Sequence, residues 1–415
     1  MTDRGAVRMV AARAALNRLS YVDRALLVAL APLLMADLGL SRAQVGLLIG
    51  FVFIAVFALG TLAVGVLADR WPRPRIIAGG LATWSVATAL TGTAGGFAPL
   101  AAWRALVGVG EASLTPSALS MLGDRVPPAR LGLANGVFYA GIPVGFAVSY
   151  AVGGAVGPWL GWRACFFLLG AAGLVAVALV WRMADTPRRG VGPQPASVGL
   201  GAAARAVAGR PVLLGLIAAA TLIVFASASG QHAIVWLVQE RGFPYSRAAF
   251  LSAIVVGAAG LGGNVGIGLL TDRAQKLCPS GRLLAFVALG AAGLAAAALF
   301  YRLPPGSAFF FPCWVLSQAW MVGWFGPLMA AIDEAAPAGK RATVLGLALL
   351  AVNLLGVATG PYVTGLIGDR ASLTAGLTWS LLPAAAGLAL VGLIGLRPSF
   401  RVDAVPGRPT RNPPS

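Results

Sequence analysis

The sequence predicts an all-α integral membrane protein with twelve transmembrane helices in two six-helix bundles. Hydrophobic residues make up 58% of its 415 residues and charged residues only 11%, less than half of the roughly 25% typical of soluble domains. The mean hydropathy is +0.84. Apolar stretches of about 20 residues, long enough to span the hydrocarbon core as a helix, recur along the chain, and one long polar interval divides them into two sets of six.

Charged or Pro- and Gly-rich breaks mark off each expected helix in turn. The first helix follows an Arg-rich start; its apolar run is too long for a signal peptide and no A-x-A site follows it, so we expect it to be retained. The first six spans are expected at 19–39, 44–68, 76–97, 99–123, 130–157 and 162–183. The other six are expected at 211–238, 246–271, 283–301, 307–332, 342–367 and 372–396.

These spans divide the chain into an N-terminal bundle (1–183) and a C-terminal bundle (211–400). The segment between them, 184–210, is a Pro-rich linker whose second half suits a short surface helix. Residues 401–415 are expected to form a disordered cytoplasmic tail.

The distribution of Lys and Arg predicts the orientation. Twenty-three basic residues fall on one side of the expected spans and six on the other, with Arg24 and Arg104 inside spans. Since the basic side faces the cytoplasm, both termini are expected inside a multi-pass protein of the inner (plasma) membrane. The formal net charge of +18 therefore reflects topology and gives no reason to expect nucleic acid as a partner.

The sequence contains no pattern that favours an enzyme. The three cysteines, Cys165, Cys278 and Cys313, are scattered, and His232 is the one histidine. No disulfide framework or metal-ligand cluster can be built from them, and neither a GxSxG elbow nor a Walker A loop is present. We expect no catalytic residue, no metal and no cofactor, with a proton gradient as the energy source.

The two bundles repeat each other in sequence. Ser41-Arg42-Ala43 opens the second expected helix and Ser246-Arg247-Ala248 the eighth, at an offset of 205. The second helix closes on Gly65-Val66-Leu67-Ala68-Asp69-Arg70, and the eighth closes on Gly268-Leu269-Leu270-Thr271-Asp272-Arg273. A parallel repeat of this kind predicts two similar bundles with a site between them at mid-depth.

The stretch from Gly65 to Arg75 reads Gly65-x-Leu67-Ala68-Asp69-Arg70-x-x-Arg73-x-Arg75 and resembles the cytoplasmic loop motif of the major facilitator superfamily. Pro72 replaces the usual Gly, and Pro74 splits the basic pair. The resemblance implies the major facilitator fold and secondary transport.

Further motifs resemble the Spinster family of that superfamily, which moves lysophospholipids and sphingosine-phosphate-like lipids. They are Ser20-Tyr21-Val22-Asp23-Arg24, Arg104-x3-Gly108-Val109-Gly110-Glu111-Ala112-Ser113 with Pro116, Asp124, Pro127 and Arg130, and Gly161-Trp162-Arg163. Organic-anion symporters of the same superfamily share the Asp-Arg pair and the Arg-x6-Glu spacing.

The resemblance also implies a cytoplasmic gate, formed by Gly65, Asp69, Arg70, Arg73, Arg75, Asp124, Asp272 and Arg273. Asp69 would lie against the start of the eleventh helix near Arg341, and Arg70 would reach Asp124. Asp272 and Arg273 would mirror them near Arg130. The alternative is a loop turn with solvated charges.

Four charges inside expected spans are the main evidence for function: Asp23, Arg24, Arg104 and Glu111. A charge at the bilayer centre costs roughly 2.5–3.5 kcal/mol even on insertion scales. Arg104 and Glu111 are two helical turns apart and share a helix face with Gly108. We expect the first helix to pack closely against this face at Gly108. The charges of Asp23, Arg24, Arg104 and Glu111 sum to zero, which suggests a paired network for proton coupling and for binding an anionic headgroup. The alternative is a static helix-to-helix clamp.

Several polar or aromatic residues are candidates for lining the cavity, with interhelix packing as the alternative for each: Asn135, Tyr139, His232, Gln318, Trp320 and Asn353. The expected fifth helix also carries Gly141-x-Pro143-x-Gly145, which resembles a helix motif found mostly in exporters of the superfamily.

We therefore expect a monomeric, proton-coupled secondary active transporter that works by alternating access. Its expected partners are the membrane, protons and an amphipathic lipid, either a lysophospholipid or a sphingoid phosphate. Two alternatives are a proton-linked transporter of small organic anions or drugs, and a non-transporting membrane receptor.

Overall fold

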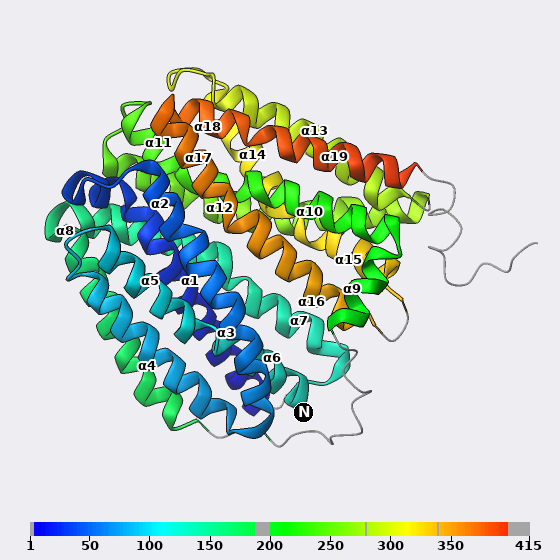
Figure 1. Ribbon diagram of the computed structural model, residues 1–415, viewed down its shortest axis with the longest axis horizontal. Helices are drawn as coiled ribbons and strands as arrows, with labels where there is room; N and C mark the ends of the chain where they lie inside the picture. The colour runs from blue at the N-terminus through cyan, green and yellow to red at the C-terminus, as the bar shows by residue number, and fades with distance from the viewer. Residues whose placement is uncertain (1–3, 184, 187–199, 279, 338–339, 397–415) are drawn as a thin grey trace, which may run out of the picture.

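The computed structural model describes residues 4–183, 185–186, 200–278, 280–337 and 340–396, and these residues fold into helices and connecting turns without a strand. The helices form two bundles that lie side by side, one coloured blue to cyan-green and the other green to red (Figure 1). The predicted all-α membrane fold is confirmed.

The N-terminal bundle, called the N half below, contains eight helical segments. They are α1 (Arg4–Leu38), α2 (Arg42–Ile49), α3 (Phe51–Arg70), α4 (Arg73–Thr91), α5 (Phe97–Glu111), α6 (Leu114–Arg125), α7 (Pro128–Tyr139) and α8 (Gly141–Trp181). Consecutive short segments such as α2 and α3, or α5 and α6, follow one another as the two parts of one span.

The C-terminal bundle, the C half, begins after the short helix α9 (Leu200–Ala208). Its segments are α10 (Pro211–Ser229), η1 (Gly230–His232), α11 (Ala233–Gln239), α12 (Tyr245–Leu277), α13 (Gly281–Phe300), α14 (Phe310–Gly323), α15 (Phe325–Ala335), α16 (Arg341–Ala351), η2 (Val352–Val357), α17 (Thr359–Arg370), α18 (Leu373–Trp379) and α19 (Leu381–Gly395). The predicted tail 401–415 lies outside the described residues, as does the linker segment 187–199.

Ten helical segments of the described chain are long and apolar enough to cross a membrane. One of them, Arg130–Trp181, has 52 residues and would measure about 78 Å as a straight helix, far more than one crossing of about 30 Å. Gly161 interrupts it with φ 78° and ψ 161°, so this segment supplies two spans. The remaining expected span is α4, which packs against α5 and α8. The twelve-helix fold thus follows.

Local sequence explains several helix boundaries. Ser41 opens α2 through a capping box, in which its hydroxyl accepts the Gln44 N–H at 3.1 Å and its own N–H donates to Gln44 Oε1 at 2.9 Å. Pro128 stands in the first turn of α7, where a missing N–H costs nothing. Within the eleventh expected span, η2 is a π-helical turn, a form frequent at functional sites.

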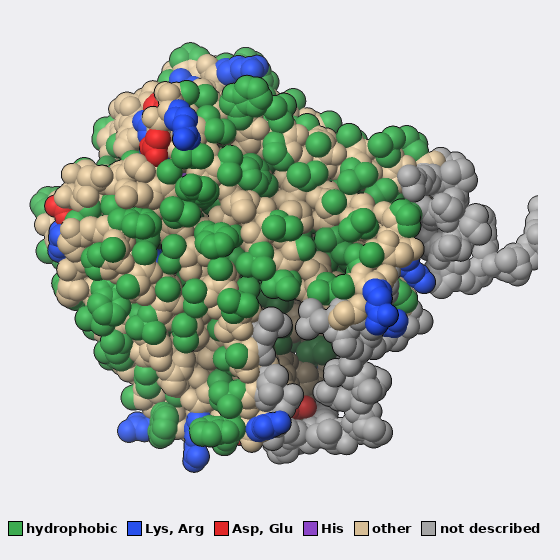
Figure 2. Space-filling view, in the orientation of Figure 1, with side chains coloured by type: hydrophobic (Ala, Val, Ile, Leu, Met, Phe, Trp, Pro, Cys, Tyr) green, Lys and Arg blue, Asp and Glu red, His purple; other side chains and the backbone are tan. Residues whose placement is uncertain are grey.

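The two halves touch at one end of the molecule and separate at the other. The sealed end contains the end of α1, the start of α2, α11 and the turn between α17 and α18; the open end contains the start of α1, the end of α6 and the start of α16 (Figure 1). The halves meet where α2 packs on α17 and where α8 packs on α12. Figure 2 shows the surface hollowed between the halves at the open end.

Small residues allow the close contact of α2 with α17. A Cβ atom at Gly46 would lie 2.3 Å from the carbonyl oxygen of Pro361, and one at Gly50 would lie 2.3 Å from that of Ala358. Without a hydrophobic driving force in lipid, such backbone-to-backbone packing holds membrane helices together. The sealed end is therefore closely packed between the halves, whereas the surface is hollowed at the open end.

Candidate functional site

The four predicted membrane charges come together at mid-depth in the N half, and they pair crosswise between α1 and α5. The carboxylate of Asp23 lies 3.6 Å from NH1 of Arg104. Its other oxygen accepts a short hydrogen bond from the hydroxyl of Thr88 on α4. Three helices therefore hold this pair.

The second pair joins the neighbouring residue of α1 to the last residue of α5. Arg24 donates through Nε to Glu111 Oε2 at 2.5 Å, and the Ser20 hydroxyl donates to the same oxygen at 2.7 Å. Ser20 is one turn before Arg24 on α1, which places both donors on one side of the carboxylate. We call Asp23, Arg24, Arg104 and Glu111 the charge quartet below.

Burial distinguishes Arg24 from the rest of the quartet. The side chains of Arg104, Asp23 and Glu111 are 2%, 3% and 0% exposed, whereas that of Arg24 is 15% exposed. Buried charges are stable only when paired and hydrogen-bonded. Arg24 is the member that solvent or a ligand reaches first.

Hydrogen bonding within the quartet is incomplete. Among the described residues, four of its buried polar atoms have no hydrogen-bond partner: Asp23 Oδ1, Arg104 Nε, Arg104 NH1 and Glu111 Oε1. An unsatisfied buried polar group costs about 1–3 kcal/mol, and more when it is charged. The site therefore has unused capacity to bind a proton, water or a polar ligand group.

Aromatic rings surround the Arg24 guanidinium. Its carbon lies 4.7, 4.9 and 4.3 Å from the ring centres of Tyr21, Phe53 and Phe57, and the guanidinium of Arg104 lies 4.9 Å from that of Phe53. A cation over an aromatic face is stabilised by the ring quadrupole. The site thus combines cationic and apolar surface in one place.

One expectation about this face is wrong. Gly108 was expected to admit the first helix, but a Cβ there would meet the backbone of α3, 3.0 Å from the Phe53 oxygen and 3.3 Å from the Phe57 nitrogen. Gly108 therefore brings α3 and its two phenylalanines close to α5, while α1 reaches the quartet with its side chains.

The loop motif between α3 and α4 acts within the N half in this structure. Arg73 is the buried residue of the motif, and it pairs with Asp124 at the end of α6 and with Asp185 at 3.1 Å. It also donates to the Thr186 carbonyl at 2.7 Å and to the Ser120 hydroxyl at 2.9 Å. Arg73 thus ties α4 and α6 to the start of the linker.

This arrangement corrects the expected pair of Arg70 with Asp124: Arg70 is exposed, and Arg73 occupies the position beside Asp124. Of the other predicted gate residues, Gly65 is half-buried and Arg75 is exposed, while the side chain of Asp69 lies outside the described part of the chain. Because the halves are apart at this end, the structure does not test the contacts expected between them.

The C half repeats the Arg73 arrangement in weaker form. Arg282, at the start of α13, lies 3.4 Å from Asp272 and forms a short ion pair with Glu334 of α15. The expected contact of Asp272 with Arg130 would join the two halves and stays a prediction, and Arg273 is exposed. Both acids are well exposed, 65% and 41%, so this pairing is closer to a surface network.

The sealed end holds a polar cluster that sequence reasoning missed. The Asp369 carboxylate accepts the N–H groups of Arg42 and Ala43, both at 2.9 Å. The Arg42 side chain donates to the Gly368 carbonyl at 2.6 Å. A carboxylate at a helix N-terminus is favourable because the unpaired N–H groups carry partial positive charge. Asp369 thereby caps α2 from the other half.

Arg42 also contacts the end of α11. Its Nε donates to Gln239 Oε1 at 3.1 Å, and NH1 lies 3.4 Å from Glu240. Glu240 in turn accepts the N–H groups of Leu373 and Thr374, at 2.5 and 2.9 Å, at the start of α18. The sealed end is thus held by two carboxylates at helix N-termini with Arg42 between them.

The predicted cavity-lining residues separate into two groups. Asn135, Gln318 and Asn353 are half-buried and Tyr139 is 39% exposed, which is compatible with a cavity. Trp320 is 1% exposed and packs on Gly290 and Gly293 of α13, so it is a packing residue. His232 is buried at the sealed end, with Nε2 3.2 Å from the Arg42 carbonyl, and does not line the open hollow.

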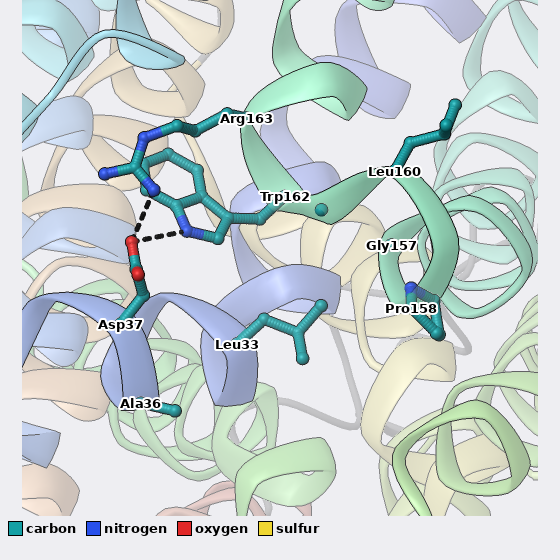
Figure 3. A pocket seen from close by; sticks show the side chains of 9 residues that line it. Leu33, Ala36, Asp37, Gly157, Pro158, Leu160, Trp162 and Arg163 are labelled. Carbon is teal, nitrogen blue, oxygen red and sulfur yellow. Dashed lines mark hydrogen bonds and ion pairs between the residues drawn. The ribbon is translucent and has the colours of Figure 1, made fainter.

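A pocket of about 580 Å³ lies at the sealed end, away from the charge quartet (Figure 3). In it, Asp37 at the end of α1 accepts hydrogen bonds from Arg163 at 2.5 Å and from Trp162 Nε1 at 3.1 Å. Gly161, with positive φ, makes the turn that presents both residues. This stretch therefore holds the end of α1 to the connection between the fifth and sixth spans.

Sequence signals for the missed residues were weak. Arg42 was noted only as part of the repeat, and the partners Thr88 and Ser20 are ordinary small polar residues whose role depends on which helix faces them. No group of three or more potential metal ligands occurs among the described residues. The expectation that no metal or cofactor is needed stays a prediction.

Comparison with known proteins gives a family and several relatives. Residues 15–361 match the Major Facilitator Superfamily. A protein of Mycolicibacterium smegmatis described as an MFS-type efflux pump is 30% identical over 391 residues, covering 92% of this chain and 89% of its own length. The 3-(3-hydroxy-phenyl)propionate transporter of Escherichia coli is 29% identical over 344 residues, covering 80% and 79%.

Spinster proteins are also similar. Human protein spinster homolog 1 is 31% identical over 185 residues, covering 44% of this chain and 35% of its own. A crystal structure of a bacterial homolog to the human lysosomal transporter Spinster, in an inward-facing and unoccupied conformation, superimposes with a TM-score of 0.85 over 98% of this chain and 100% of that one. Its 21% identity makes this a likeness of fold. The expected resemblance to the major facilitator superfamily and to Spinster proteins is confirmed.

Proposed function

Because the chain belongs to the Major Facilitator Superfamily, we propose that this membrane transporter is a secondary active transporter driven by protons, with an amphipathic anion or zwitterion as its substrate. The observation that carries the proposal is the charge quartet, which is buried, neutral in sum and incompletely hydrogen-bonded. A static clamp between helices would be expected to satisfy its polar atoms, because unsatisfied groups weaken it.

A proton and an anionic substrate would bind to opposite members of the same ion pair. A proton on Glu111 would release Arg24 from its 2.5 Å pair, and Arg24 is the least buried member of the quartet. The freed guanidinium can then bind a phosphate or carboxylate through two parallel hydrogen bonds. Proton binding would thus favour substrate binding. This is what coupled movement of proton and substrate in the same direction across the membrane requires.

The substrate class follows from the surroundings of Arg24. Tyr21, Phe53 and Phe57 line the guanidinium, so a ligand there meets a charged group and apolar surface together. A lysophospholipid or a sphingoid phosphate has a headgroup and a tail that match. The fold likeness to a bacterial Spinster homolog and the partial sequence match to human spinster homolog 1 support this class.

A second candidate function is proton-linked transport of small organic anions or drugs. The relatives that cover most of the chain favour it, because they are described as an efflux pump and as a transporter of an aromatic propionate. The same Arg24 site would bind their carboxylates. The two candidates differ in whether a long apolar tail is required.

We further propose that the open end faces the cytoplasm, which places both termini inside the plasma membrane and makes this conformation inward-facing. The asymmetry of basic residues supports it, since Arg73, Arg210, Arg282 and Arg341 all lie at helix starts of the open end. The expected monomeric state stays a proposal.

The test is uptake by the full-length protein in proteoliposomes, with labelled lysophosphatidic acid and labelled 3-phenylpropionate compared with and without an inward proton gradient. We expect gradient-dependent uptake of the lipid, and Glu111→Gln should retain measurable exchange while losing the response to the gradient. The matched control is Glu334→Gln, an exposed acid at the open end, which should keep that response.

Uptake of phenylpropionate without lipid transport would replace the lipid proposal by the small-anion one. A Glu111→Gln protein with full gradient dependence would remove Glu111 from the coupling step.

A further inference from the structure

We infer that His232 is a second protonation site of the transport cycle, through which acid on the sealed side favours opening of that end. The inference rests on the proposed transport function but uses a different site from the charge quartet. His232 lies in η1 between α10 and α11, where the C half faces the start of α2, and its side chain is 0% exposed.

The hydrogen bonds of the ring indicate its protonation state. Nε2 lies 3.2 Å from the carbonyl oxygen of Arg42, and because a carbonyl only accepts, Nε2 carries a proton. Nδ1 has no well-aligned hydrogen bond among the described residues, although the Ser229 carbonyl one turn earlier lies near the ring. In a neutral ring Nδ1 is an acceptor without a donor. In a charged ring its buried N–H would meet only this poorly aligned carbonyl, next to a positive charge. The sealed arrangement therefore suits the neutral ring.

Among the described residues, the charged groups near the ring already have other hydrogen-bond or ion-pair partners. From α2, Arg42 brings a positive charge close to the ring. From α17, Asp369 accepts two N–H groups of α2, and beyond α11, Glu240 accepts two N–H groups of α18. Neither carboxylate can turn to a charged His232 without weakening its bonds to a helix N-terminus. A proton on Nδ1 would thus oppose the contacts that hold the halves together.

Opening of the sealed end removes this conflict. When α2 moves away from η1, water reaches the ring and the charged form becomes acceptable. A proton then binds preferentially to the open state and shifts the population toward it. Closing the end again requires the proton to leave. His232 would therefore link the pH on the sealed side to the return of the empty transporter.

The experiment measures opening directly in the full-length protein. Ser229, one turn before His232 and fully buried, is changed to Cys in a chain whose native cysteines are replaced by Ser. A maleimide that cannot cross the membrane is added on the sealed side at pH values from about 5 to about 8, which bracket histidine titration. Ala308→Cys, in the exposed loop at the same end, corrects for the pH dependence of thiol labelling.

We expect the corrected labelling rate of Ser229→Cys to rise about tenfold from the alkaline to the acidic limit. His232→Gln keeps an N–H donor for the Arg42 carbonyl and cannot become charged, so its rate should stay at the alkaline value. His232→Arg carries a permanent charge and should label fast at every pH. This second variant also gives a result if the glutamine protein is unstable.

A pH-dependent rate in His232→Gln, or a pH-independent rate in the parent, would overturn the inference. The Glu111→Gln variant separates this result from the proposed function. If Glu111→Gln loses gradient-driven uptake but keeps the pH-dependent labelling, both proposals stand. If labelling responds to pH while no substrate shows gradient dependence, the coupling proposal fails and the role of His232 in opening stands.

Discussion

The two halves share one fold, yet they hold different chemistry at mid-depth. In the N half, α1 and α5 bring four charged side chains together in the interior. In the C half, the charged residues that the structure describes lie within about two turns of a helix end. There, Trp320 of α14 fills the space against two glycines of α13.

This difference shows how a parallel repeat can separate two tasks. Each half contributes six spans in the same order along the chain, as a parallel repeat predicts. The N half alone, among the described residues, carries paired charges in its interior. The interior of the C half is instead apolar and closely packed, as at Trp320.

The largest expected effect comes from removing one charge of the quartet. Arg104→Ala removes the cation that pairs with the buried Asp23 carboxylate and leaves only its hydrogen bond from Thr88, and breaking a buried pair in this way costs about 3–5 kcal/mol. Because Arg104 also belongs to the proposed site for protons and substrate, we expect uptake in proteoliposomes to fall at least about 100-fold, the effect of losing about 2.8 kcal/mol of binding free energy. Arg302→Ala, an exposed arginine of the C half at the sealed end, is the control and should transport normally.

The pair itself is tested by adding Asp23→Asn to a milder change, Arg104→Gln. The double variant has no unpaired charge, so its thermal stability in detergent should exceed that of Arg104→Gln alone, while transport stays low. Equal transport in the double variant and the parent protein would show that the pair is a structural clamp.

The next effect tests whether the C half acts through packing. Trp320→Ala should lower the free energy of unfolding by about 3–5 kcal/mol, because the ring is 1% exposed and contacts Gly290 and Gly293. A detergent thermal-shift assay measures this loss. The protein that remains folded should keep the parent's dependence of uptake on the proton gradient, with Trp320→Phe as the milder control. Altered gradient dependence in folded Trp320→Ala would place Trp320 in the transport site.

The smallest effect compares the two arginine networks at the open end. Arg73 is 1% exposed and contacts two carboxylates, two hydroxyls and a carbonyl, so Arg73→Ala should cost about 1.5–3 kcal/mol. Arg282 contacts well-exposed acids, and Arg282→Ala should cost about 1 kcal/mol or less. Unfolding temperatures measured at low and high salt give both values. Equal losses of stability in the two variants would mean that the Arg73 and Arg282 networks stabilise their own halves equally.

Much of the molecule was visible in the sequence because the bilayer imposes a simple rule. A helix must be about 20 apolar residues long to cross, so span number, bundle boundaries and the linker follow from composition along the chain. The same rule singles out Asp23, Arg24, Arg104 and Glu111, because a charge within an apolar stretch needs a protein partner.

Other features depended on which helices pack together, and a single helix does not encode its neighbour. The sequence allows either combination of the two acids with the two arginines. The packing of α1 against the other helices of the N half places Asp23 beside Arg104 and Arg24 beside Glu111. Gly108 marks a close approach in sequence, but only the fold shows that α3 is the helix that approaches. Arg70 and Arg73 are equally plausible partners for Asp124 until the turn before α4 buries one of them.

The sealed end was beyond sequence reasoning for the same reason. The N–H groups of Arg42 and Ala43 bind Asp369, 327 and 326 positions away in the chain, and His232 reaches the Arg42 carbonyl across the two halves. Periodicity and composition report on neighbours one or two turns apart. The sequence by itself therefore determined the fold class, the spans and which charges must be buried. The tertiary structure decided their partners and which end is closed, because those depend on contacts between distant segments.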